Sequence, residues 1–146
     1  MKGALHPPQP INYLRMASIF TKIVKGEIPA WKVAETDDYL AFLDIRPLKK
    51  GHTLVIPKRE EDYLFDLKDE ELAGLMLFAK RVARAIEKVV PCKRIGLTVV
   101  GLEVPHAHVH LIPIDEIGDM NFANPPVEMS QEAFEELAGQ IAKTFE

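Results

Sequence analysis

Three histidines occupy every second position in the segment EVPHAHVHLIP, residues 103–113. Because side chains alternate along a strand, His106, His108 and His110 would share one face, while the apolar residues between them would face the core. Imidazoles so close together disfavour simultaneous protonation, so at least one should be neutral near pH 7. A neutral imidazole can act as a nucleophile, a base or a metal ligand. The strip therefore indicates a site of chemistry, the alternative being an accidental surface cluster.

A metal site is the less favoured use of these histidines. On a strand, neighbouring members of the strip lie roughly 6.6 Å apart and the outer pair roughly 13 Å, so two could reach one ion but three could not easily do so. Further ligands would have to come from His52, Cys92, His6 or carboxylates. A metal-dependent hydrolase remains an open alternative at this point.

Alternating and helical patterns predict the elements that position the strip. Apolar residues at helical spacing begin at Ile19, and a long apolar stripe runs from Leu72 to Val90 before Pro91. A last amphipathic helix starts at Ser130, a good N-cap residue, and buries one apolar face. Strands are predicted at 31–36, 39–45, 52–57, 94–100 and 106–114.

This order predicts an α+β fold: a five-stranded, mainly antiparallel sheet covered on one face by helices, with one long helix, a short N-terminal helix and a C-terminal helix. Residues 1–16 are rich in proline and lack periodicity, so we expect a leader outside the domain; a functional arm is the alternative. The domain itself should span 17–114. Residues 115–146 would form a C-terminal extension that carries the amphipathic helix.

Composition excludes several classes of protein. With 146 residues, of which 47% are hydrophobic, the chain can form one compact core. A net charge of −4 argues against a nucleic-acid-binding surface. There is no apolar run of the roughly 18–20 residues that a membrane helix requires, so no membrane partner is expected. The single cysteine, Cys92, suits a reducing compartment, and we expect a cytoplasmic protein.

The segment HAHVHLIP resembles the His-x-His-x-His-x-x signature of the histidine triad (HIT) family of nucleotide hydrolases and transferases. The segments SIFTKIVKGEIPAWKV, YLAFLDIRP and GHTLVIPK are similar to the N-terminal half of that family, in the same order and at similar distances. The resemblance covers roughly residues 18–114. It implies the HIT-like fold, a homodimer, no cofactor, and a purine nucleoside phosphoramidate or related conjugate as the substrate.

The resemblance also implies roles for single residues. His108 would attack the α-phosphorus and become transiently nucleotidylated, which splits one hard displacement into two easier ones. His110 would contact the phosphate oxygens and assist the leaving group. His106 and His52 would support them from behind.

For the nucleoside, the resemblance assigns Asp44 to the ribose hydroxyls, although a carboxylate there could simply start a turn. Gly101 would belong to the phosphate-binding loop. An apolar base pocket would be formed by Ile19, Phe20, Ile23, Ile28 and Ile45, but residues of these types at helical spacing are also typical of a core.

Two departures from the family pattern bear on activity and metal. In the loop VVGLEVPHAH, Leu102 and Glu103 replace polar donors, and the loss of one such donor typically costs about 10²–10³ in rate. Glu103 would also repel a phosphate, unless it is only a solvated turn charge. The runner-up is therefore a catalytically weak binding or regulatory module. Because Ser18 and Thr21 stand where some relatives have a zinc-binding C-x-x-C, we predict no metal.

Overall fold

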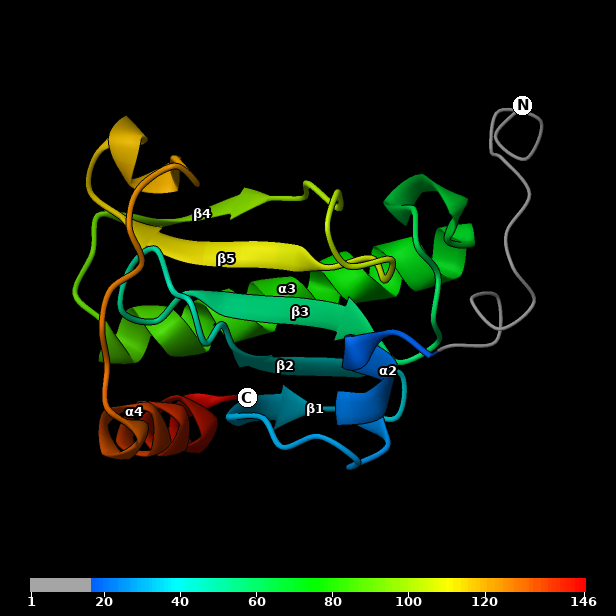
Figure 1. The fold of residues 1–146 in the computed structure, drawn as a ribbon, viewed down its shortest axis with the longest axis horizontal. Coiled ribbons are helices and arrows are strands. Elements are labelled where there is room, and N and C mark those ends of the chain that lie inside the picture. Colours follow the sequence, from blue (N-terminus) through cyan, green and yellow to red (C-terminus); the bar gives the residue numbers. More distant parts are fainter. Residues whose placement is uncertain (1–16) are drawn as a thin grey trace.

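The computed structural model describes residues 17–146, so the expectation for residues 1–16 lies outside the described residues. Five strands form one sheet in the order β1-β2-β3-β5-β4, and each neighbouring pair is antiparallel (Figure 1). The strands are β1 (Lys32–Glu35), β2 (Tyr39–Leu43), β3 (Thr53–Pro57), β4 (Arg94–Thr98) and β5 (Val109–Ile114). The predicted α+β class and five-stranded antiparallel sheet are confirmed.

Helices cover both faces of this sheet, whereas the sequence had suggested one. The long helix α3 (Asp69–Val89) and the C-terminal helix α4 (Gln131–Thr144) pack on the same core cluster (Figure 1). The short helix α2 (Ile19–Val24) packs on the opposite face. It does so because Phe20 and Ile23, its two buried residues, contact strand residues of the other parity. Short 3₁₀ turns at Leu64–Asp66 and Ile117–Met120 complete the described elements.

The main core lies between the sheet and α3. This helix buries one stripe: Leu75, Phe78, Ala79, Val82, Ala85 and Ile86. Helix α4 starts after Ser130, whose hydroxyl accepts the Ala133 N–H, as the sequence predicted. Its buried residues are the four expected ones, Phe134, Leu137, Ala138 and Ile141. The rings of Trp31 and Phe134 stack at 6.3 Å and anchor α4 beside β1.

The face that carries α2 also carries the polar residues of interest. Leu40, Leu54 and Ile56 pack under α2. By strand alternation, His52 lies on the same face as Leu54, and Leu54 is the register partner of His110. α2 covers only part of this face: Phe20 of α2 contacts His106 and His108, whereas His52 and His110 line a pocket beside it.

The predicted fifth strand is shorter than expected at its start. β5 begins at Val109, so His106 and His108 precede it in irregular backbone rather than lying on a strand. The Ala107 N–H bonds to the Glu61 carbonyl, which holds this segment outside the sheet ladder. Among the described residues, no helix is long and apolar enough to cross a membrane.

Candidate active site

One pocket of about 530 Å³ gathers most of the polar residues singled out in the sequence. Its wall is built from the end of β2, the β2–β3 loop, the loop before the histidines and the segment after β5. The lining residues are Asp44, Arg46, Leu48, His52, Val100, Gly101, Leu102, Glu103, His108, His110, Phe122, Asn124 and Pro126. Gly101 has φ of +71°, a conformation that favours glycine and turns this loop toward the pocket.

His108 presents one ring nitrogen to this pocket. Its Nδ1 lies 2.7 Å from the backbone carbonyl of His106, which can only accept, so Nδ1 carries the hydrogen. Nε2 is then the unprotonated nitrogen of the neutral ring. Within the described part of the chain, no buried side-chain nitrogen or oxygen lacks a partner. Residues 17–146 offer no hydrogen-bond partner to His108 Nε2, and because His108 lines the pocket, this nitrogen opens to it with its lone pair available.

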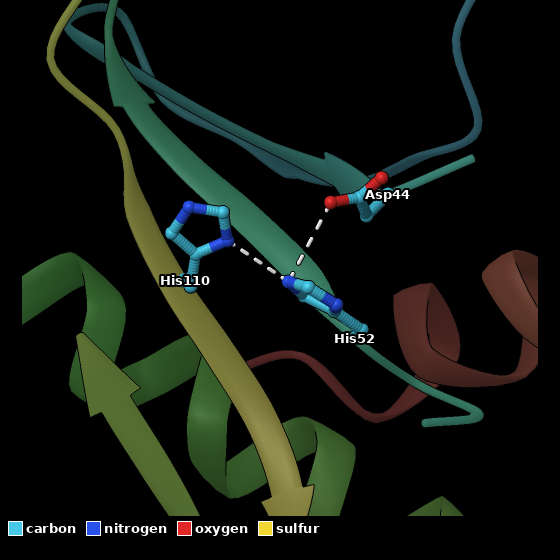
Figure 2. Close-up of side chains that lie close together, drawn as sticks. All are labelled: Asp44, His52 and His110. Atoms are coloured by element: carbon cyan, nitrogen blue, oxygen red, sulfur yellow. Dashed lines mark hydrogen bonds and ion pairs between the residues drawn. The ribbon is translucent and has the colours of Figure 1, made fainter. Parts of the chain in front are cut away.

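His52 and His110 form a directed pair beside it (Figure 2). The Leu48 N–H donates to His52 Nδ1 at 3.0 Å, so His52 Nε2 carries the hydrogen and donates to His110 Nδ1 at 2.9 Å. His110 Nε2 then carries its own hydrogen as a donor at the pocket. Burial lowers the pKa of His52 to about 4, and burial together with His52 lowers that of His110 to about 4. Both rings are therefore neutral near pH 7.

Asp44 stands next to this pair (Figure 2). Its Oδ1 accepts the Arg46 N–H at 2.8 Å, so the carboxylate does start the turn after β2. Its Oδ2 lies 3.5 Å from His52 Nε2, a contact with a neutral ring rather than an ion pair. Asp44 also lines the pocket, and a carboxylate has more acceptor sites than these two contacts use, so it can still accept from a ligand.

His106 is fully buried and does not line the pocket. Its Nε2–H donates to the Pro57 carbonyl at 2.8 Å, and its Nδ1 accepts from the Ser18 hydroxyl at 2.7 Å. The Thr21 hydroxyl lies 3.3 Å from the same Nδ1 and donates to Glu60 at 2.6 Å. Burial lowers the pKa of His106, so this ring is also held neutral.

The apolar residues expected to form a base pocket do not line this cavity. Phe20 and Ile23 are the buried residues of α2, facing the sheet, and Ile28 packs against the same cluster. Phe20 still touches the site, because its ring meets that of His108 edge-on at 5.1 Å. Ile19 and Ile45 are 49% and 71% exposed, so they are open to a ligand but are not enclosed.

The cluster of Asp44, His52 and His110 resembles a metal site by distance alone, since one ligand atom from each lies within 4.8 Å of the others. The hydrogen bonds do not fit that use. His52 would have to bind through Nε2, and neutral imidazole would then carry its hydrogen on Nδ1, where the Leu48 N–H already points. Metal binding would therefore break a buried backbone hydrogen bond, and the absence of metal stays our prediction.

Several residues at the site escaped the sequence analysis. The ring of Phe122 packs edge-on against His110 at 4.9 Å and closes one side of the pocket. The segment that carries Phe122 is attached to the β2–β3 loop by a hydrogen bond from the Val127 N–H to the Pro47 carbonyl, at 2.7 Å. The only signal was an aromatic residue in a loop that otherwise lacks apolar periodicity. Leu48 contributes through its backbone, which no side-chain pattern reveals.

Comparisons with known proteins agree with this fold. The chain is 45% identical over 100 residues to the adenosine 5'-monophosphoramidase hnt1 of Schizosaccharomyces pombe, covering 67% of this chain and 74% of that protein. A Hit-like protein of Bartonella henselae superimposes with a TM-score of 0.76 at 32% identity, covering 88% and 96% of the two chains. A Zn-bound histidine triad family protein of Mycobacterium smegmatis gives 0.74 at 30%, covering 88% and 95%. Residues 25–117 match the HIT domain, and the chain belongs to the HIT family.

Proposed function

We propose that this protein is a nucleoside phosphoramidase that cleaves at the α-phosphorus of a purine nucleoside monophosphate conjugate through a nucleotidyl-histidine intermediate. The observation that carries the proposal is the His108 ring, whose Nδ1–H is bound to a backbone carbonyl and whose Nε2 lone pair opens to the pocket. The 45% identity to an adenosine 5'-monophosphoramidase supports the choice of a phosphorus–nitrogen bond.

In the first step, His108 Nε2 attacks the α-phosphorus, a phosphorus–nitrogen bond forms, and the bond to the leaving amine breaks. The amine departs with the electron pair and takes up a proton from solvent. The ring becomes positively charged, and its Nδ1–H remains bonded to the His106 carbonyl, which stabilises this charge. Water then attacks the same phosphorus, the bond to Nε2 breaks, and a proton of that water returns to solvent. The nucleoside monophosphate is released and His108 is neutral again.

The neighbouring groups have distinct tasks in this scheme. His110 Nε2–H donates to a phosphate oxygen or to the leaving nitrogen, and His52 keeps that hydrogen on Nε2 by donating to Nδ1. Asp44 accepts from the ribose hydroxyls, and Gly101 lets the loop backbone approach the phosphate. The exposed side chains of Ile19 and Ile45 would flank the base, with Phe20, Ile23 and Ile28 as support beneath.

The test is turnover without metal. Purified protein is incubated with adenosine 5'-phosphoramidate, and in parallel with dinucleoside polyphosphates, in the presence of a chelator, and released AMP is quantified. We expect AMP from the phosphoramidate in wild type and none in His108→Ala. If AMP is released equally by both proteins, or only after a divalent metal is added, the proposal fails.

One observation favours a second candidate, a binding module with little catalysis. The loop before the histidines brings Glu103 and Leu102 to the pocket, and Leu102 is 88% exposed. Neither side chain supplies a donor to the phosphate in the transition state, so catalysis loses more than nucleoside binding does. AMP binding with no measurable turnover on any conjugate would select this candidate.

We also expect a homodimer in the cytoplasm, without nucleic acid or membrane partners. Strand β4 is one edge of the sheet and exposes Leu97, and α3 exposes Leu77. An open strand edge beside exposed apolar side chains is suited to pairing with a second copy. The sedimentation coefficient at micromolar concentration tests this expectation.

A further inference from the structure

We propose that Glu60 is a positioning residue for the nucleophile: it fixes the N-terminus of helix α2 against His106, and through His106 it sets the orientation of His108. The inference deepens the proposed function and rests on it. Glu60 does not line the pocket, so it has no contact with substrate in this scheme.

The first link joins Glu60 to α2. One carboxylate oxygen, Oε1, accepts two hydrogen bonds, from the Ser18 N–H at 2.7 Å and from the Thr21 hydroxyl at 2.6 Å. Partial burial raises the pKa of Glu60, but these bonds outweigh it and lower the pKa overall, so the group is ionised near pH 7. A carboxylate at a helix N-terminus also satisfies backbone donors that the helix leaves unpaired.

The second link joins α2 to His106. The Ser18 hydroxyl accepts the Thr21 N–H at 2.9 Å as the helix N-cap. Its own hydrogen has two acceptors in reach, and His106 Nδ1 at 2.7 Å is nearer than the Thr21 hydroxyl at 3.3 Å. On the other side of the ring, Nε2–H bonds to the Pro57 carbonyl. Both ring nitrogens of His106 are therefore hydrogen-bonded, and the bond at Nδ1 depends on the position of Ser18.

The third link reaches the nucleophile by two routes. The His106 carbonyl accepts the His108 Nδ1–H at 2.7 Å, which fixes both the tautomer and the direction of Nε2. The ring of Phe20, which belongs to α2, packs edge-on against His106 at 5.8 Å and against His108 at 5.1 Å. A shift of α2 would therefore move a polar and an apolar contact of the nucleophile together.

The helix needs this tether because it is only six residues long. Isolated helices shorter than about 12–15 residues are marginal in water, so the position of α2 depends on its tertiary contacts. A misplacement of about 1 Å at a reacting group can cost about 10²-fold in rate. Loss of the tether should consequently appear in kcat more than in substrate affinity.

The experiment compares Glu60→Ala with Glu60→Gln, whose amide oxygen can accept the same two bonds. We expect Glu60→Ala to lower kcat by about tenfold or more with KM within about twofold, and Glu60→Gln to stay within about twofold of wild type in both. The control is Glu61→Gln, which should leave both constants unchanged, because among the described residues the Glu61 carboxylate pairs with Arg59 alone, at 3.6 Å. A kcat for Glu60→Ala equal to that of wild type overturns the proposal, as does a loss of equal size in Glu60→Gln.

A second readout does not depend on turnover. The ¹⁵N chemical shifts of His106 should report a single tautomer with hydrogen on Nε2 in wild type and in Glu60→Gln, and a mixed or exchanging signal in Glu60→Ala. If neither wild type nor any variant hydrolyses a phosphoramidate, the proposed function fails. The chemical shifts still show whether Glu60 positions His106. An unchanged His106 spectrum in Glu60→Ala rejects the tether. Should Glu60→Ala fail to fold, Thr21→Val, which removes one of the two bonds, replaces it in both measurements.

Discussion

His106 and His110 stand four residues apart, are both buried and both have a lowered pKa, yet their surroundings are opposite. His106 has a protein partner at each ring nitrogen and no access to the pocket. His110 has a partner at one nitrogen, His52, and offers the other to a ligand. The difference shows that the partners of an imidazole, rather than its spacing in the chain, decide whether it supports a site or acts in it.

Backbone groups establish this difference. The Pro57 carbonyl orients His106, the His106 carbonyl orients His108, and the Leu48 N–H orients His52. A carbonyl can only accept and an amide N–H can only donate, so each neutral ring has one allowed tautomer. These tautomers hold only while each ring keeps its place against its backbone partner, and the place of His106 also depends on the Ser18 hydroxyl. The tautomer of His110 follows from the side chain of His52.

The largest expected effect is at His108, which lies between the two. His108→Ala should reduce turnover by at least about 10³-fold while nucleotide affinity changes only a few-fold, because the lost interaction belongs to the chemical step. A rapid acid-free quench with an α-labelled phosphoramidate should trap label on wild type, stable to base and labile to acid. Label of equal amount on His108→Ala would show that another residue is the nucleophile.

Substitution of the two outer histidines, His106 and His110, should affect different properties of the protein. His106→Ala leaves a cavity and an unpartnered Pro57 carbonyl, so it should lower the free energy of unfolding by about 2–4 kcal/mol. His110→Ala should lower kcat by about 10²-fold and weaken phosphate binding, with a smaller loss of stability. Chemical denaturation gives the free energy of unfolding of both variants, and steady-state kinetics gives their kcat. If both variants lose stability and kcat in the same proportion, the two histidines do not differ in role.

Acid should destabilise the protein through His52 and His110. Unfolded histidine binds a proton below about pH 6.5, whereas these two in the folded state do so only near pH 4. The unfolded state therefore binds more protons in this window, and the free energy of unfolding falls as the pH drops from about 6.5 toward 4. At about 1.4 kcal/mol per pKa unit, one such group contributes on the order of 3–4 kcal/mol. Melting temperatures from pH 7.5 to 4.5 should show a shallower fall in His110→Ala than in wild type.

A substitution of Asp44 tests whether the pocket binds the ribose next to His52. Asp44→Ala should weaken AMP more than its 2′,3′-dideoxy analogue, because a charge-assisted hydrogen bond contributes about 1.5–3 kcal/mol. Competition binding against both ligands gives the two losses. Equal losses would mean that the bond to the Arg46 N–H is the whole role of this carboxylate.

The smallest effect is expected at Glu103, on the other wall of the pocket. Glu103→Ser should raise turnover a few-fold, since it removes a charge that repels phosphate and supplies a donor. The kcat/KM of the variant, with Glu61→Gln as a charge-matched control, measures this. A lower or unchanged value would show that Glu103 points away from the phosphate.

Periodicity was sufficient to predict the sheet, α3 and α4, because their stripes are long and regular. It could not predict which face α2 would cover, since six residues carry too little pattern. It also extended the last strand over His106 and His108, because alternation continues in the sequence where the ladder has ended. The contacts that orient the histidines could not be predicted for a different reason. Leu48 and Pro57 act through backbone groups, and Glu60 acts on Ser18, which is 42 residues away in the chain.

The pairing of β3 with β5 has a consequence for folding and for ligand binding. It joins Thr53 to Leu111 and Leu54 to His110, and the whole of α3 lies in the chain between them. Asp44 and His52 precede α3 in the sequence, whereas His108 and His110 follow it. The site therefore forms only after β3 and β5 have paired, and a contact between segments so far apart in the chain forms slowly. A nucleotide that bridges the two halves binds the closed form alone, and saturating AMP should therefore raise the melting temperature and protect the amides of β3 and β5 from hydrogen exchange.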